Sequence, residues 1–371
     1  FLVSAQVQQG ALFYDKAWPV LTDIQAGLIF HNEQMQITGR SAKTVGVPLK
    51  DIKVSIADLT ASNTALDIQG KASAPLATLL AFSTRSPIQQ MTSGFLGSIR
   101  AKGEGTVALN LRIPLVGNEN PHVNGKLFFL GNTLALTSLP IPELSDVQGS
   151  LNFTERGVYS PNIQMKAWGG TFTLTADTPR TGGTHVAVEG TAETAQVVSS
   201  YSPALSSYVR GHSRYHADFV IRNGLENLNV SSDLVGTNIR TVPPVGKTPE
   251  EAKKFTLTLT PLLKEAQMEA EVTLGTETRS RWRISDEGKW LGGQVAVNTP
   301  LPAYSNDNGF HLSVVMPSIE LEAYRRLVAG STAPDLTMPL TIQLKSPIVT
   351  WQNCHLNDVV ATVRHVPAGQ A

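Results

Sequence analysis

The sequence predicts an all-β protein built as an elongated, curved and mainly antiparallel sheet, a β-groove with a few short helices. Three observations support this fold class. Apolar and polar residues alternate in short segments along the whole chain, glycine and proline stand between these segments, and helical patterns are few. Alternation with a period of two gives a strand one apolar and one polar face, which is typical of antiparallel sheets wetted on one side.

The expected strands are the segments in which this alternation is clearest. Val107, Leu109 and Leu111, for example, alternate with Ala108 and Asn110. Since successive side chains of a strand point to opposite faces, each such segment has one apolar face. The same pattern predicts strands at residues 52–56, 66–68, 107–113, 171–176, 255–260, 268–274 and 342–344.

Glycine and proline are expected to mark the boundaries of these strands. Glycine reverses the chain at little steric cost, and proline cannot donate a hydrogen bond to a sheet ladder. The 22 prolines therefore predict loops, as at residues 242–245. The glycines expected at strand ends are Gly70, Gly105, Gly125, Gly149, Gly190 and Gly275.

Helical patterns are short. Pro75 to Phe82 predicts one or two turns with proline at the start, and Thr191 to Val209 predicts one or two helices interrupted at Pro203. Ser318 to Ala329 is the clearest, with Ser318 as a candidate cap.

A loose recurrence suggests repeated β units. Residues 47–52 and 141–147 both lead through an aspartate and a β-branched residue into a strand, and residues 70–72 and 190–192 both precede a helical stretch. Strands followed by a small helix and more strands indicate stacked units of one kind. Candidate sub-units of the 1–371 fragment are 1–100, 101–210 and 211–371.

Composition excludes some functions and suggests a compartment. The 30 basic residues equal the 30 acidic residues, so no global field attracts nucleic acid. Only 16% of residues are charged, and no run of about 18 apolar residues is present. With one cysteine, no intrachain disulfide can form. Because Phe1-Leu2-Val3 shows neither methionine nor a signal-peptide pattern, we expect a fragment whose anchor lies elsewhere.

Catalytic and metal-binding motifs are not found. No G-x-S-x-G sequence occurs, and Cys354 is expected to be a buried, inert thiol. His212 and His216 would lie about 13 Å apart on a strand, too far for one zinc ion. We expect no catalytic residue, metal or cofactor, and no enzyme. The basic stripe at residues 279–283 is interpreted as a solvated outer face, with a phosphate contact as the alternative.

The apolar face of the sheet then has two interpretations. It is either the core of a closed sandwich or barrel, or the lining of a trough for acyl chains, which gain about 0.8 kcal/mol per buried CH₂ group. Alternation alone does not separate these interpretations. The residues expected to line the trough are Val107, Leu109, Leu111, Phe172, Leu174, Leu257 and Leu259.

Several motifs, in matching order, resemble the YhdP branch of the AsmA-like family. Ser232–Gly236 followed by Val242–Lys247 is similar to its S-x-L-x-G and L-P-x-P-x-G-K signature, with Val242 in place of leucine. Asp146–Phe153 is similar to its D-V-x-G-x-L-x-F segment. Leu321–Tyr324 looks like its late L-D-x-x-W segment, with Tyr324 near the usual tryptophan.

The resemblance implies a Gram-negative protein anchored in the inner membrane by an N-terminal helix that this fragment lacks. Its periplasmic β-trough would carry phospholipid acyl chains toward the outer membrane and support the permeability barrier, with outer-membrane components as further candidate partners. One alternative is a non-catalytic envelope scaffold or assembly protein with a closed β core. A second is a carbohydrate-active β-helix enzyme, which would need clustered carboxylates and a strict short repeat.

Overall fold

The computed structural model describes residues 1–13, 16, 18–86, 95–117, 120–137, 141–222, 224–262, 267–285, 289–302, 309–328 and 338–367. Strands make up 66% of it, which confirms the all-β class. The chain divides into two compact units. Unit 1 comprises Phe1–Ala167, Thr171–Val188 and Val220–Gly224, and unit 2 comprises Trp168–Gly170, Glu189–Phe219 and Leu225–Ala371. The three sub-units expected from the sequence stay a prediction.

The strands cover all the segments in which alternation was clearest. From the N-terminus they are β1 (Leu2–Leu12), β2 (Leu21–His31), β3 (Gln34–Thr44), β4 (Val47–Ile56), β5 (Ala65–Pro75), β6 (Ile99–Lys102), β7 (Glu104–Pro114), β8 (His122–Leu136), β9 (Leu144–Thr154), β10 (Gly157–Ala167), β11 (Gly170–Asp177) and β12 (Thr184–Glu193). They continue as β13 (Val209–Ile221), β14 (Leu225–Ser232), β15 (Thr237–Ile239), β16 (Phe255–Leu262), β17 (Gln267–Leu274), β18 (Thr278–Ser285), β19 (Trp290–Val297), β20 (Phe310–Val315), β21 (Ile319–Glu320), β22 (Leu340–Trp351) and β23 (Cys354–His365). The short helices are α1 (Leu76–Thr84), the 3₁₀ turn η1 (Phe95–Ser98), α3 (Thr194–Tyr201), α4 (Pro203–Ser206) and α5 (Leu321–Val328).

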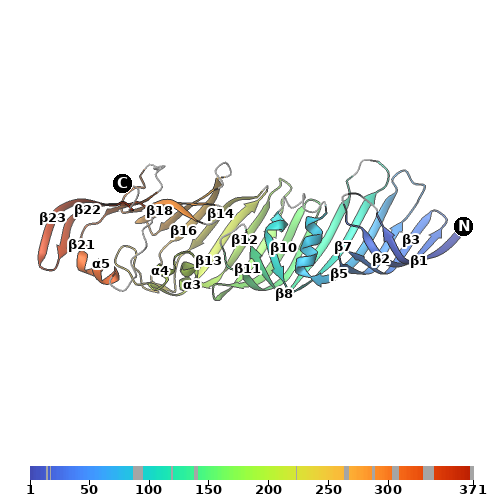
Figure 1. Cartoon of the computed structure of the whole chain (residues 1–371), viewed down its shortest axis with the longest axis horizontal. Helices are drawn as coiled ribbons and strands as arrows, with labels where there is room; N and C mark the ends of the chain where they lie inside the picture. The colour runs from blue at the N-terminus through green and yellow to red at the C-terminus, as the bar shows by residue number, and fades with distance from the viewer. Residues whose placement is uncertain are drawn as a thin grey trace. The chain divides into compact units, whose positions relative to one another are not determined.

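Unit 1 is an antiparallel meander. Each strand from β1 to β5 pairs with the next along the chain, and the ladder continues from β5 through β7, β8 and β9 to β10. Consecutive strands therefore lie side by side, as Figure 1 shows. The short strand β6 pairs with the distal part of β8. Antiparallel pairing confirms the expectation from alternation.

Unit 2 is a mixed sheet, which the alternation did not predict. Strand β14 pairs with β16, and the ladder from β16 to β19 is antiparallel, as is the pair of β22 and β23. Strand β20 is instead parallel to both β19 and β22, and β21 is parallel to β22. Parallel pairs require long connections, which residues 298–309 and 321–339 supply. Alternation of apolar and polar residues shows which face of a strand is exposed, but not whether the neighbouring strand is parallel or antiparallel.

The recurrence around Asp51 and Asp146 has a structural basis. A Leu-x-Asp-Ile/Val sequence occurs at 21–24, 49–52, 144–147 and 356–359, and in each case the aspartate adopts a φ between 51° and 53°. Aspartate tolerates this left-handed conformation better than most residues. Where the register is irregular, as between Lys50 and Lys53, the ladder contains a β-bulge. Ion pairs of 3.1, 3.4 and 2.9 Å join the first three aspartates to lysines twenty positions later, Asp23 to Lys43, Asp51 to Lys71 and Asp146 to Lys166.

The prediction that glycines mark strand ends is wrong for most of those named. Gly275 does lie in the turn between β17 and β18, with a φ of +64°. Gly105 is the second residue of β7 and so lies close to a strand end, whereas the others lie inside strands: Gly70 in β5, Gly125 in β8, Gly149 in β9 and Gly190 in β12. At Gly125 and Gly149 the neighbouring strand leaves no room for a side chain. At Gly149, for example, an added Cβ would lie 2.5 Å from the carbonyl oxygen of Asn162.

The helices are close to their predicted positions. Helix α1 begins directly after Pro75, and α3 and α4 lie within the Thr191–Val209 stretch with a break at Ser202, directly before Pro203. Helix α5 begins at Leu321, later than predicted, so Ser318 does not cap it. Ile319 instead pairs with Val349 in a parallel ladder. Ala329, the predicted end of this helix, lies outside the described residues.

Leu76 anchors helix α1 to the sheet of unit 1. Its side chain is 1% exposed, and its amide donates to the carbonyl oxygen of Gly103 at 2.8 Å. We expect Leu76→Ala to lower the free energy of unfolding by about 3 kcal/mol, the middle of the range for a buried leucine. Urea denaturation followed by circular dichroism measures this, with Ala77→Ser at the neighbouring exposed position as the control. A loss similar to that of the control would contradict the anchoring role.

Candidate functional site

One face of unit 1 is apolar across consecutive strands. We call it the apolar face of unit 1 and define it by two rows of residues that are Cα partners from strand to strand. The first row is Ala5, Leu28, Ile37, Val54, Ile68, Leu111 and Val123, on β1 to β5, β7 and β8. The second is Ala72, Val107, Leu127 and Leu151, on β5, β7, β8 and β9. Since the register keeps these residues in line, the face is continuous and not a set of separate patches.

The opposite face of unit 1 is polar. A row of Cα partners crosses β3 to β8 as Gln36, Ser55, Asp67, Arg112 and His122. Arg112 and Asp67 form an ion pair of 3.3 Å, and both side chains are well exposed. The sheet therefore separates a water-facing side from an apolar side.

Val107, Leu109 and Leu111, predicted from the sequence to line a trough, all lie on the apolar face of unit 1. Their Cα partners on β8 are Leu127, Gly125 and Val123. All three retain partial exposure, so the described residues do not bury them as a closed core would. Of the two predicted residues on β11, Phe172 is 7% exposed and Leu174 is partly exposed.

Unit 2 has an apolar face of its own. We define the apolar face of unit 2 by the row of Cα partners from β14 to β22: Leu228, Leu259, Ala270, Trp282, Gly293, Phe310 and Leu340. Part of this face is closed by its own side chains. Leu259 is 6% exposed in a buried cluster with Leu228, Ala270 and Ile284, whereas Leu257 packs at its margin and is partly exposed. The two predicted residues on β16 thus differ in burial.

Short helices cover parts of both apolar faces. In unit 1, Leu76 and Leu79 of α1 lie so close to Gly105 that each would be 3.2 Å from an added Cβ. In unit 2, Tyr324 of α5 packs against a buried cluster that includes Met316 and Val349. Cover is therefore local, and it leaves the central residues of unit 1 partly exposed.

The basic stripe at residues 279–283 lies on the polar face of unit 2 beside matching carboxylates. Glu271 is the Cα partner of Arg281, and Glu269 is that of Arg283. The guanidinium of Arg281 donates to the Glu271 carboxylate at 2.8 Å. This ladder of acidic and basic side chains supports the solvated outer face and weakens the phosphate-binding alternative. The alternation of the arginines alone does not indicate these glutamates, because they belong to the neighbouring strand β17.

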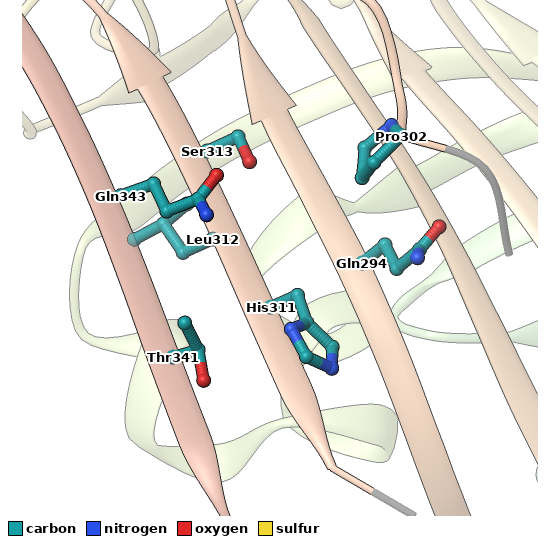
Figure 2. Close-up of a pocket in the computed structure, with 7 residues that line it drawn as sticks. All are labelled: Gln294, Pro302, His311, Leu312, Ser313, Thr341 and Gln343. Carbon is teal, nitrogen blue, oxygen red and sulfur yellow. The ribbon is translucent and has the colours of Figure 1, made fainter. Parts of the chain in front are cut away.

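A small pocket lies on the same polar face, on the parallel strands β19, β20 and β22. Figure 2 shows its lining residues, among them Gln294, His311 and Gln343. Its volume is about 130 Å³, whereas sites for small organic ligands usually have about 300 Å³ or more. The pocket is therefore too small for a lipid.

A buried lysine, Lys247, holds the segment between β15 and β16. The ammonium group of Lys247 donates to the carbonyl oxygens of Leu234, Thr237 and Thr248 at 2.9, 2.5 and 2.7 Å. Burial lowers the pKa of Lys247, and Glu251 and Glu250 oppose this effect. The hydroxyl of Thr237 extends the network to Ser213 and Thr194, each at 2.6 Å.

The structure corrects one expectation about reactive groups. Cys354 is exposed on β23 and not buried, because β23 pairs on one side with β22. His212 and His216 both lie on β13, and His216 contacts the carboxylate of Glu189 at 3.1 Å. Within the described part of the chain, no three His, Cys, Asp or Glu side chains gather in a way that could hold a metal ion.

Each of the two units is thus an all-β sheet with one apolar and one polar face. A family model described as YhdP protein matches residues 1–371, and the chain belongs to the YhdP family. This is an envelope-associated family of lipid-transport proteins, in which enzymatic activity is not known. Comparisons with curated proteins and with solved structures gave no match. Over the described residues, no helix has the length and apolar character needed to span a membrane.

Proposed function

We propose that this chain carries phospholipid between the inner and outer membranes of a Gram-negative envelope and thereby supports the outer-membrane permeability barrier. The acyl chains lie on the apolar face of unit 1, and the headgroups stay in contact with water. We place the chain in the periplasm as part of a protein anchored in the inner membrane by a helix outside these residues. The observation that carries the proposal is the continuous apolar face of unit 1, whose central residues stay partly exposed.

The energetics suit lipid tails better than a ligand held by specific polar groups. Each buried CH₂ group contributes about 0.8 kcal/mol, so two acyl chains on an aliphatic surface bind firmly without a polar anchor. The two rows of unit 1 consist of leucine, isoleucine, valine and alanine. Family membership supports the same function.

Native mass spectrometry of the chain purified from Gram-negative cells tests the proposal. We expect mass additions that correspond to phospholipid and that disappear after extraction with organic solvent. The alternative, a non-catalytic envelope scaffold with a closed β core, predicts a well-folded chain without bound lipid. That result, obtained under conditions that preserve the circular dichroism spectrum, would exclude the transport proposal for this chain.

A further inference from the structure

On the apolar face of unit 1, one aromatic ring lies flat over a glycine of the neighbouring strand. Gly125 of β8 and Phe153 of β9 are Cα partners. A Cβ added to Gly125 would lie 2.1 Å from Cζ of Phe153 and 2.3 and 2.7 Å from two further ring carbons. The end of the Phe153 ring thus lies where the Cβ atom of any other residue at position 125 would be. Phe153 therefore lies along the sheet and does not stand up from it.

Unit 2 repeats this arrangement with a larger ring. Trp282 of β18 and Gly293 of β19 are Cα partners, and a Cβ added to Gly293 would lie 2.2 Å from Cε3 of Trp282. The indole reaches over β19 toward Phe310 of β20, with 6.1 Å between the ring centroids. Its indole nitrogen donates to the Ser280 hydroxyl at 2.8 Å. These contacts hold the ring down against the strands.

Glycine inside a strand lowers stability, because it loses more backbone entropy on folding than other residues and has no side chain that could pack. Here the glycine provides space for a cross-strand ring at the level of the sheet. Leu109 lies between two glycines, since Gly70 and Gly125 are its Cα partners on the two sides, and only Gly125 lies under a ring. At Gly70 only the Lys50 carbonyl oxygen lies within 4 Å of an added Cβ, at 3.9 Å, so this position is open.

We infer that the glycine–aromatic pairs Gly125–Phe153 and Gly293–Trp282 set the depth available to acyl chains on the two apolar faces. This inference rests on the proposed function and identifies residues that determine which tails fit. With the rings flat, an extended hydrocarbon chain can pass over the strands. A side chain at either glycine would lift the ring away from the sheet by about the thickness of that side chain. The raised ring would then obstruct the acyl chain at that point.

The test compares phospholipid binding by the 371-residue chain and its Gly125→Val variant. Vesicles of dioleoyl phosphatidylcholine with a trace of tail-labelled fluorescent phospholipid serve as the probe. A lifted ring would displace roughly two methylene groups of a bound phospholipid in total, so we expect binding about tenfold weaker. The matched control is Gly27→Val on β2, where an added Cβ meets nothing within 4 Å and faces the polar side. This control should bind like the wild type.

The double variant Gly125→Val with Phe153→Ala separates obstruction from misfolding. Removing the ring relieves the clash with the new valine, so the double variant should recover most of the binding. It also remains informative if Gly125→Val alone fails to fold. Equal binding by wild type and folded Gly125→Val, or no recovery in a folded double variant, would overturn the inference and leave the proposed function intact. Absence of binding by the wild type would overturn the proposed function itself.

Discussion

Leu109→Asp is expected to lose nearly all bound phospholipid while the chain keeps its fold. Leu109 is partly exposed on the apolar face of unit 1, between Gly70 and Gly125. Without lipid, a carboxylate there stays hydrated at little cost. With acyl chains over it, the same carboxylate would have to be buried unpaired, which costs several kcal/mol. Bound lipid, measured by native mass spectrometry, should fall at least about tenfold.

The neighbouring residue provides a matched control. Asn110 lies on the polar face, as the Cα partner of Gln69 and Asn124, so Asn110→Asp introduces the same charge without affecting the lipid. Leu259→Asp is a contrasting variant, because Leu259 is 6% exposed in the buried cluster of unit 2 and should not tolerate a charge. If Leu109→Asp unfolds the chain as Leu259→Asp does, Leu109 belongs to a closed core, and the scaffold alternative gains support.

Lys247→Met should destabilise unit 2 by about 3 kcal/mol. Hydrogen bonds to a charged donor contribute about 1.5–3 kcal/mol each. Part of this loss is offset, because the substitution also removes a buried charge. Methionine keeps the aliphatic stem but leaves the carbonyl oxygens of Leu234, Thr237 and Thr248 without their ammonium donor. Urea denaturation measures the loss. Limited proteolysis should show faster cleavage within residues 233–254.

Lys254→Met is the control for this prediction. Lys254 lies on the same segment, and its side chain is exposed, so its replacement should change the free energy of unfolding by less than about 0.5 kcal/mol. Equal stability of Lys247→Met and Lys254→Met would show that the buried ammonium is dispensable. Because Lys247 belongs to the motif that resembles the family signature, such a result would leave the role of that lysine to be sought outside folding.

Alternation along the chain was enough to predict seven of the strands and the division into two faces. Ile52, Val54 and Ile56 alternate with polar residues, and in the structure all three are Cα partners of residues on one side of β3. A period of two fixes which residues share a face, whatever strand lies next to them. For this reason Val107, Leu109 and Leu111 were correctly predicted to share an apolar face, while their role as a lipid lining stays a proposal.

Features that depend on a distant neighbour could not be predicted in this way. The parallel pairing of β20 is decided by the connections around it, and Gly125 and Gly293 are explained by rings on adjacent strands. Burial is equally non-local: Leu257 and Leu259 alternate identically in sequence, yet only Leu259 is buried, through side chains of β14, β17 and β18. Likewise, Cys354 is exposed because of its place on β23.

The aspartate bulges of unit 1 have a consequence for how the number of strands in such a sheet can change. Each aspartate and the lysine twenty positions later mark two adjacent strands, as Asp51 and Lys71 do on β4 and β5. When two such strands are gained or lost together, every remaining side chain still points to the same face of the sheet as before. The sheet becomes wider or narrower by about 10 Å. A single inserted residue would instead turn a strand over. Duplication in whole hairpins is thus a route by which evolution, or an engineer, could adjust the span of the sheet without redesigning its surface.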